Sequence, residues 1–122
     1  MQVKTVQICE NTFCGVDDVR LTFKDGSALH GADRQMGNPV DVSKPLTKIT
    51  TTIRRDEWGI YSIEWFFVDG SYQRMGKEYY TGGRPQTIQF ANGEILIGAR
   101  LHHDDNYTYG LGLEWITGRY AQ

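Results

Sequence analysis

Three segments of the chain combine a carboxylate with an aromatic side chain shortly before a glycine. They are residues 10–15, 54–59 and 103–110. A carboxylate accepts charge-assisted hydrogen bonds from pairs of hydroxyl groups, and these bonds are stronger than those between neutral groups. An aromatic ring packs against an apolar C–H surface. Because a sugar offers both kinds of surface, this composition predicts that the three segments bind carbohydrate.

The candidate binding residues are polar, aromatic or glycine positions within these loops. They are Asn11, Phe13, Gly15, Asp56, Trp58, Asp104, Asp105, Asn106 and Tyr107. The third loop is the strongest candidate because it carries the most polar groups. Its oxygen ligands suit calcium, but it lacks the roughly 12-residue loop and terminal Glu of an EF-hand, so we expect no metal and no cofactor. The alternative interpretation is three ordinary polar turns whose aromatic residues anchor them on the core.

The sequence lacks the motifs of several common catalytic sites. Gly-x-Ser-x-Gly, a phosphate-binding loop and His-Glu-x-x-His are all absent. Glu64 and Glu114 suggest the carboxylate pair of glycoside hydrolysis, but strand alternation places both on the face opposite the apolar residues. His102 and His103 are adjacent, so on a strand they point to opposite faces, a poor geometry for one metal. We therefore expect a protein that is not an enzyme.

Charge and hydrophobicity exclude several classes of partner. The formal net charge is −2, so there is no basic field to attract nucleic acid. No apolar run approaches the roughly 20 residues of a membrane helix, and we expect no membrane insertion. No signal peptide is visible, which leaves the compartment open between the cytoplasm and secretion by another route. Cys9 and Cys14 could be bridged or unbridged.

The elements that would hold the three loops form an internal repeat. Residues 19–27 recur 44 positions later as 63–71, with the same Asp-Gly-Ser turn, and again a further 48 positions later as 111–119. In each copy apolar residues alternate with others, as in a strand with one buried face. The Asp-Gly or Thr-Gly that comes next predicts a hairpin turn. The residues expected to meet in one core are Val19, Leu21, Ile63, Trp65, Leu111 and Leu113.

A second strand precedes each of these core strands. With the same offsets, residues 4–9 align with 48–53 and then with 96–101. No stretch shows a capped helical period. The sequence therefore predicts one all-β domain over residues 1–122, with three sheets arranged like the sides of a prism. In that arrangement all three loops lie at one end.

The chain from residue 60 to 116 resembles the jacalin-related lectins. The resemblance is carried by residues 62–67, the segment between Gly70 and Gly76, Gly82-Gly83, and the Asn-Gly-Glu-Ile-Leu-Ile-Gly run at 92–98. It implies a β-prism of three Greek-key-like antiparallel sheets about a pseudo-threefold axis. It also implies a lectin that recognises mannose- or galactose-type glycans or glycoproteins.

The binding loops of that family are matched only in part. Its Gly-x-x-x-Asp loop before the last strand has no counterpart in residues 103–109, and its glycine-rich amino-terminal loop retains Gly15 alone. No family binding residue is therefore carried across to this chain. The alternative function is a protein-interaction or assembly module on the same scaffold that has lost sugar binding.

The third copy of the repeat lacks the return segment that residues 31–42 and 76–90 provide in the others. A sheet that ends early leaves an unpaired edge, which proteins normally cover, charge or pair. Either residues 1–6 pair with this edge, or a second subunit does so across a twofold axis. We expect the second arrangement, a homodimer.

Overall fold

The computed structural model describes residues 2–8, 19–30, 36–53, 60–76, 83–103 and 110–119. Its strands are β1 (Val3–Ile8), β2 (Val19–Phe23), β3 (Ala28–His30), β4 (Val40–Asp41), β5 (Leu46–Ile53), β6 (Ile60–Phe67), β7 (Tyr72–Gly76), β8 (Arg84–Gln89), β9 (Glu94–His103) and β10 (Gly110–Arg119). The predicted all-β class is confirmed. No helix among the described residues is long and apolar enough to cross a membrane.

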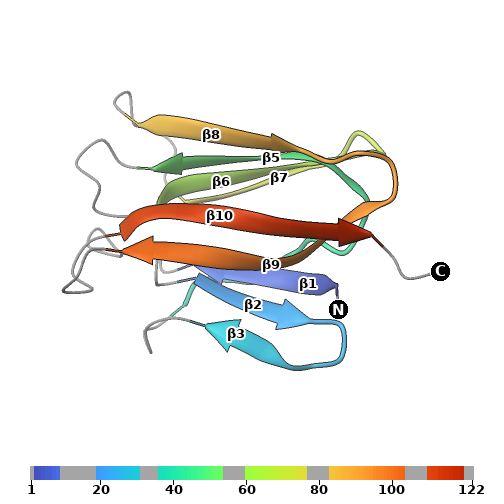
Figure 1. The fold of residues 1–122 in the computed structure, drawn as a ribbon, viewed down its shortest axis with the longest axis horizontal. Helices are drawn as coiled ribbons and strands as arrows, with labels where there is room; N and C mark the ends of the chain where they lie inside the picture. Colours follow the sequence, from blue (N-terminus) through green and yellow to red (C-terminus); the bar gives the residue numbers. More distant parts are fainter. Residues whose placement is uncertain are drawn as a thin grey trace.

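The strands form three antiparallel sheets (Figure 1). Sheet A has the order β3-β2-β1-β4, sheet B has the order β7-β6-β5-β8, and sheet C consists of β10 and β9. Sheets A and B thus share one order, in which three consecutive strands are neighbours and the fourth returns beside the first. That is the order of a Greek key. The three sheets are separate and do not close into one hydrogen-bonded body.

The first two strands of each sheet pair with the same irregularity. In each pair one residue of the first strand is skipped, which makes a β-bulge. The pairs on either side of the bulge are Val3↔Phe23 and Thr5↔Thr22 in sheet A, Leu46↔Phe67 and Lys48↔Phe66 in sheet B, and Leu96↔Thr117 and Gly98↔Ile116 in sheet C. By this register Leu21, Trp65 and Trp115 occupy corresponding positions.

This register corrects the alignment predicted from the sequence. The predicted offset matches Leu113 with Trp65, but the bulge shows that Trp115 corresponds to Trp65, two residues later. The predicted alignment of the first strands is also wrong by one residue, because Lys4 corresponds to Thr47 rather than to Lys48. A strand has a period of two, so a two-residue shift keeps every apolar side chain on its own face. Alternation alone therefore cannot detect the two-residue error at Trp115.

The two Asp-Gly-Ser turns have the predicted form. The N–H of Phe23 donates to the carbonyl of Ser27 at 2.8 Å, and the N–H of Phe67 donates to that of Ser71 at 3.1 Å. Gly26 and Gly70 have φ of 91° and 87°, in the left-handed region that favours glycine. The same hairpin therefore comes after the core strand in sheets A and B.

The predicted turn at Thr117-Gly118 is wrong. Both residues belong to β10, where Thr117 pairs with Leu96 and Gly118 pairs with Ile95. The hydroxyl of Thr117 donates to Glu94 Oε2 at 2.8 Å. The two-residue shift explains the error, because the position of the Asp-Gly turn in sheet B corresponds to residues beyond Gly118 in sheet C.

One apolar core draws side chains from all three sheets. Val19, Leu21, Ile63, Trp65 and Leu113 are buried in it, as predicted, and the side chain of Leu111 lies outside the described part. The rings of Trp65 and Trp115 meet edge-on, with centroids 5.1 Å apart. The indole N–H of Trp115 donates to Thr51 Oγ1 at 2.7 Å, which links sheet C to sheet B. The other buried apolar residues are Val3, Val6, Ile8, Val42, Leu46, Ile49, Phe67, Met75, Leu96 and Trp115.

The amino-terminal strand does not cover the edge of sheet C. β1 pairs with β2 on one side and with β4 on the other. The predicted alternative in which residues 1–6 complete the third sheet is therefore wrong for Val3 onwards. Among the described strands, nothing pairs with the outer edges of β9 and β10.

Candidate functional site

The predicted binding residues all lie outside the described part of the chain. Asn11, Phe13 and Gly15 fall in residues 9–18, Asp56 and Trp58 in 54–59, and Asp104, Asp105, Asn106 and Tyr107 in 104–109. Their role in binding stays a prediction. The strand residues on either side of each segment are described, so the positions in space of the two residues that border each segment are known.

Each predicted loop begins and ends on a pair of neighbouring strands. Ile8 pairs with Val19, Ile53 with Ile60, and His103 with Gly110. β1, β5 and β9 run in the same direction, so their carboxyl ends lie at one end of the molecule, on the left in Figure 1. The described turns, including residues 24–27 and 68–71, lie at the opposite end. The strand ends that border the three loops are therefore gathered on one side.

Glu64 and Glu114 lie on the outer faces of sheets B and C, as alternation predicted. Glu64 Oε2 accepts a hydrogen bond from the hydroxyl of Tyr72 at 2.8 Å. Burial and the bond to Glu64 raise the pKa of the Tyr72 hydroxyl. Glu114 forms an ion pair with Arg100 at 3.1 Å. The two carboxylates thus lie on separate sheets, and each has its own partner.

A hollow of about 430 Å³ lies at the end with the turns. Three of its lining residues, Gln2, Pro45 and Ile95, lie at or next to the start of the first strands of sheets A, B and C. Phe90 adds an apolar surface and Asn92 a polar one. Its size is within the range of small-molecule sites, roughly 300–1,000 Å³. No local sequence signal marks this hollow, because its lining comes from segments far apart in the chain.

Glu94 is the one acidic side chain among the described residues that line this hollow, and both of its carboxylate oxygens accept hydrogen bonds from other residues of the chain. Glu94 Oε1 accepts a hydrogen bond from the N–H of Ala91 at 2.6 Å, and Oε2 accepts one from Thr117. These two bonds, the one from Ala91 foremost, lower the pKa of the Glu94 carboxyl. Its main role in the described structure is to join the turn before β9 to β10.

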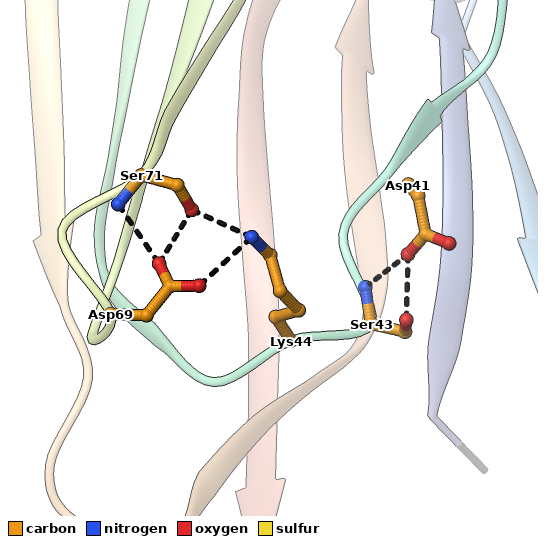
Figure 2. Close-up of polar contacts among 5 residues, drawn as sticks. All are labelled: Asp41, Ser43, Lys44, Asp69 and Ser71. Carbon is orange, nitrogen blue, oxygen red and sulfur yellow. Dashed lines mark hydrogen bonds and ion pairs between the residues drawn. The ribbon is translucent and has the colours of Figure 1, made fainter.

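A second hollow of about 370 Å³ lies between sheets A and B beside a polar cluster. Figure 2 shows Lys44, from the segment between β4 and β5, reaching the turn between β6 and β7. Its ammonium donates to Asp69 Oδ2 at 3.0 Å and to Ser71 Oγ at 2.7 Å. The same ammonium lies 4.8 Å from the centre of the Phe67 ring. Lys44 therefore fastens the linker between the two sheets to the hairpin of sheet B.

Three aspartates share one local arrangement, in which a serine two residues later donates both its N–H and its hydroxyl to the carboxylate. They are Asp25, Asp41 and Asp69, with Ser27, Ser43 and Ser71. These bonds lower the pKa of all three carboxyls, because they favour the ionised form. For Asp69 the pKa falls to about 2, with the Ser71 hydroxyl as the largest cause and Lys44 as a further one.

The described residues contain no group of three or more His, Cys, Asp or Glu side chains that could hold a metal ion. No protein-family model matches the chain, and no curated protein matches it either.

Proposed function

We propose that this chain is a non-catalytic lectin of the jacalin-related type. It binds mannose- or galactose-type glycans or glycoproteins through its three loops. One observation carries the proposal: the strand ends that border residues 9–18, 54–59 and 104–109 all lie at the same end of the molecule. Under this proposal the three loops of acid-and-aromatic composition share one surface. Several weak sites on one body raise avidity without any new contact.

The same proposal includes a β-prism built from an internal repeat and spanning residues 1–122 as one domain. The shared strand order of sheets A and B supports it, as does the bulge at the same point in all three sheets. The corresponding residues Leu21, Trp65 and Trp115 are all buried in one core. Under this proposal each sheet forms one side of the prism.

A glycan array with the protein displayed at high density tests the binding. We expect retention of mannose- or galactose-type glycans by the parent chain. Replacing Asp104 and Asp105 by Ala should lower the retention at least about 10-fold, because charge-assisted bonds to sugar hydroxyls are lost. The matched control is Asp69→Ala, which removes a carboxylate from a turn at the opposite end and should leave binding unchanged. If the parent and the double variant bind equally, the third loop is not part of the binding site.

A second candidate is an assembly module on the same scaffold that does not bind sugar. The observation that favours it is sheet C, whose two ten-residue strands both present free edges among the described strands. If this candidate is right, the chain retains no glycan on the array but still self-associates in solution. Sugar retention by the parent argues against it.

A further inference from the structure

The edges of sheet C differ from those of the other two sheets. Proteins protect sheet edges by making the outer strands short or by placing proline and charged residues on them. The outer strands of sheet A have three and two residues. Those of sheet B have five and six, and the six-residue β8 contains Pro85. β9 and β10 have ten residues each, lack proline, and are the longest strands described.

The backbone of β10 points hydrogen-bonding groups toward the edge with which no described strand pairs. In sheets A and B the N–H of Phe23 or Phe67 reaches outward to the chain that continues into the third strand. Thr117 corresponds to these two residues by the bulge register. Its N–H is therefore directed away from β9, and alternation along an antiparallel strand directs the groups of Trp115 and Leu113 the same way. A strand laid beside β10 would meet this row.

Among the described residues, the outer face of sheet C lacks beside Ile116 the ring and ammonium contacts that cover Phe66 in sheet B. In sheet B the ring of Phe66 is covered by Tyr72 of the third strand, with centroids 5.1 Å apart, and by Lys48 Nζ at 4.5 Å from the ring centre. Ile116 corresponds to Phe66, and its neighbour across the sheet is Gly98. No described strand takes the place of β7 beside it. Within the described structure, the position beside Ile116 is therefore open to a further strand.

We propose that the free edge of β10 binds β10 of a second copy of this chain, antiparallel across a twofold axis. Such an axis pairs each strand with its own copy and so forms a closed dimer. The joined sheet has the order β9-β10-β10-β9, which gives four strands, the number found in sheets A and B. The edge of β9 is less suited because its bulge at Ile97 interrupts regular pairing. Pairing of β10 with β9 of another copy would not close and would give filaments.

The side chains select a register for this pairing. Centring the axis on Glu114 would set like charges opposite each other, which is unfavourable. Centring it on Ile116 sets Ile116 against Ile116 of the second copy, as Tyr72 covers Phe66 in sheet B. In that register Thr117 N–H donates to the carbonyl of Trp115 of the second copy, and Glu114 faces Gly118 of the second copy. This pairing does not depend on what the three loops bind.

Two proline variants, one on β10 and a control on β8, test whether the edge of β10 forms the dimer. Thr117→Pro removes the outward N–H of β10, and analytical ultracentrifugation should show a dimeric parent and a monomeric variant. Thr87→Pro is the control: the N–H of Phe90 donates to Thr47, so alternation directs the N–H of Thr87 to solvent. Each change also removes one hydroxyl contact, Thr117 to Glu94 or Thr87 to Thr50. The control should remain dimeric. A monomeric parent, or a dimeric Thr117→Pro chain, would overturn the proposal.

Circular dichroism would reveal whether Thr117→Pro folds. If it does not, cysteine cross-linking tests the pairing of the two β10 strands instead. In a chain with Cys9 and Cys14 replaced by Ser, Ile116→Cys should form a disulfide-linked dimer on mild oxidation. Opposed residues of a non-hydrogen-bonded pair have Cα atoms about 4.5 Å apart, within the range for a disulfide. Glu114→Cys, two residues from the axis, should cross-link at least about 10-fold more slowly, because its Cα lies beyond that range from its own copy. No linkage at position 116, or faster linkage at 114, would refute the pairing through Ile116.

Discussion

Sheets B and C begin alike and end differently. Both start with a bulged strand pair, place a buried Trp at the same position, and carry a Glu on the outer face beside it. They diverge two residues after the Trp: in sheet B Phe67 is succeeded by a turn, and in sheet C Thr117 continues into Gly118 within the strand. The core strand thus buries a Trp at the same position in the four-stranded sheet B and in sheet C, for which two strands are described. The segment after the core strand decides the width of the sheet.

The two corresponding tryptophans also differ in one polar contact. The indole N–H of Trp115 donates to Thr51, whereas that of Trp65 is buried without a partner among the described residues. Thr51→Val should give Trp115 the same unpaired state. We expect a loss of about 1–3 kcal/mol in the free energy of unfolding, measured by urea denaturation, because a buried donor is left unsatisfied.

The matched control for that change is Thr50→Val on the same strand. The hydroxyl of Thr50 lies 3.0 Å from that of Thr87 on the exposed face. Loss of an exposed contact should alter stability by no more than about 0.5 kcal/mol. Equal effects of the two variants would show that the hydrogen bond from Trp115 to Thr51 adds no more to the free energy of unfolding than an exposed contact does.

Glycine-to-alanine substitutions should separate the turns of sheets A and B from the strand end of sheet C. Gly26→Ala and Gly70→Ala force a left-handed conformation on alanine, and each should destabilise by about 1–2 kcal/mol. Gly118→Ala should change stability by less than about 0.5 kcal/mol. Its added Cβ meets Ile97 Cδ1 at 3.0 Å, which is the movable end of a side chain. Thermal unfolding of the three variants measures the contrast. A loss at Gly118 as large as that at Gly26 or Gly70 would contradict it and would show that Ile97 cannot make room for the added Cβ.

The smallest expected effect is the acid sensitivity of the hairpin in sheet B. The pKa of Asp69 is lowered from 3.8 to about 2 in the folded chain, so the ionised carboxylate stabilises the fold above pH 3.8. That contribution should disappear as the pH falls toward about 2. Asp69→Asn should therefore flatten the pH dependence of the urea midpoint over this interval.

Lys44→Gln serves as the companion variant. It removes a lesser cause of the lowered pKa and leaves both bonds from Ser71, so most of the pH dependence should remain. If Lys44→Gln flattens the profile as much as Asp69→Asn does, the ion pair rather than the serine governs the carboxylate.

The strand pattern and two of the three turns could be predicted from the sequence. Alternation identified which face of each core strand is buried, and Asp-Gly-Ser identified the hairpins at Gly26 and Gly70. The alignment of Trp115 could not be predicted, because a shift of two residues preserves alternation. The bulges also escaped prediction, since skipping one residue leaves no signature in the types of Lys4, Thr47 and Ile97.

Less of the candidate site could be predicted. The prediction that the three loops share one side depends on the equal direction of β1, β5 and β9. The described strands have that direction, and the position of the loops themselves stays a prediction. The hollow lined by Gln2, Pro45 and Ile95 depends on contacts between residues far apart in the chain. Such contacts are fixed by how the sheets pack, and no local pattern reports them. The sequence predicts an unpaired edge in the third sheet, but the length of β10 required the correction at Thr117-Gly118.

Each sheet is drawn from one uninterrupted stretch of chain, namely 3–41 for sheet A, 46–89 for sheet B and 94–119 for sheet C. No described strand is exchanged between sheets, and the paired strand residues lie at most 41 positions apart, as Lys48 and Gln89 do. Proteins whose contacts are more local have lower contact order and fold faster. We therefore expect that each sheet can form from its own segment of the chain. Only the burial of the shared core, with Trp115 against Trp65, requires the described sheets to meet.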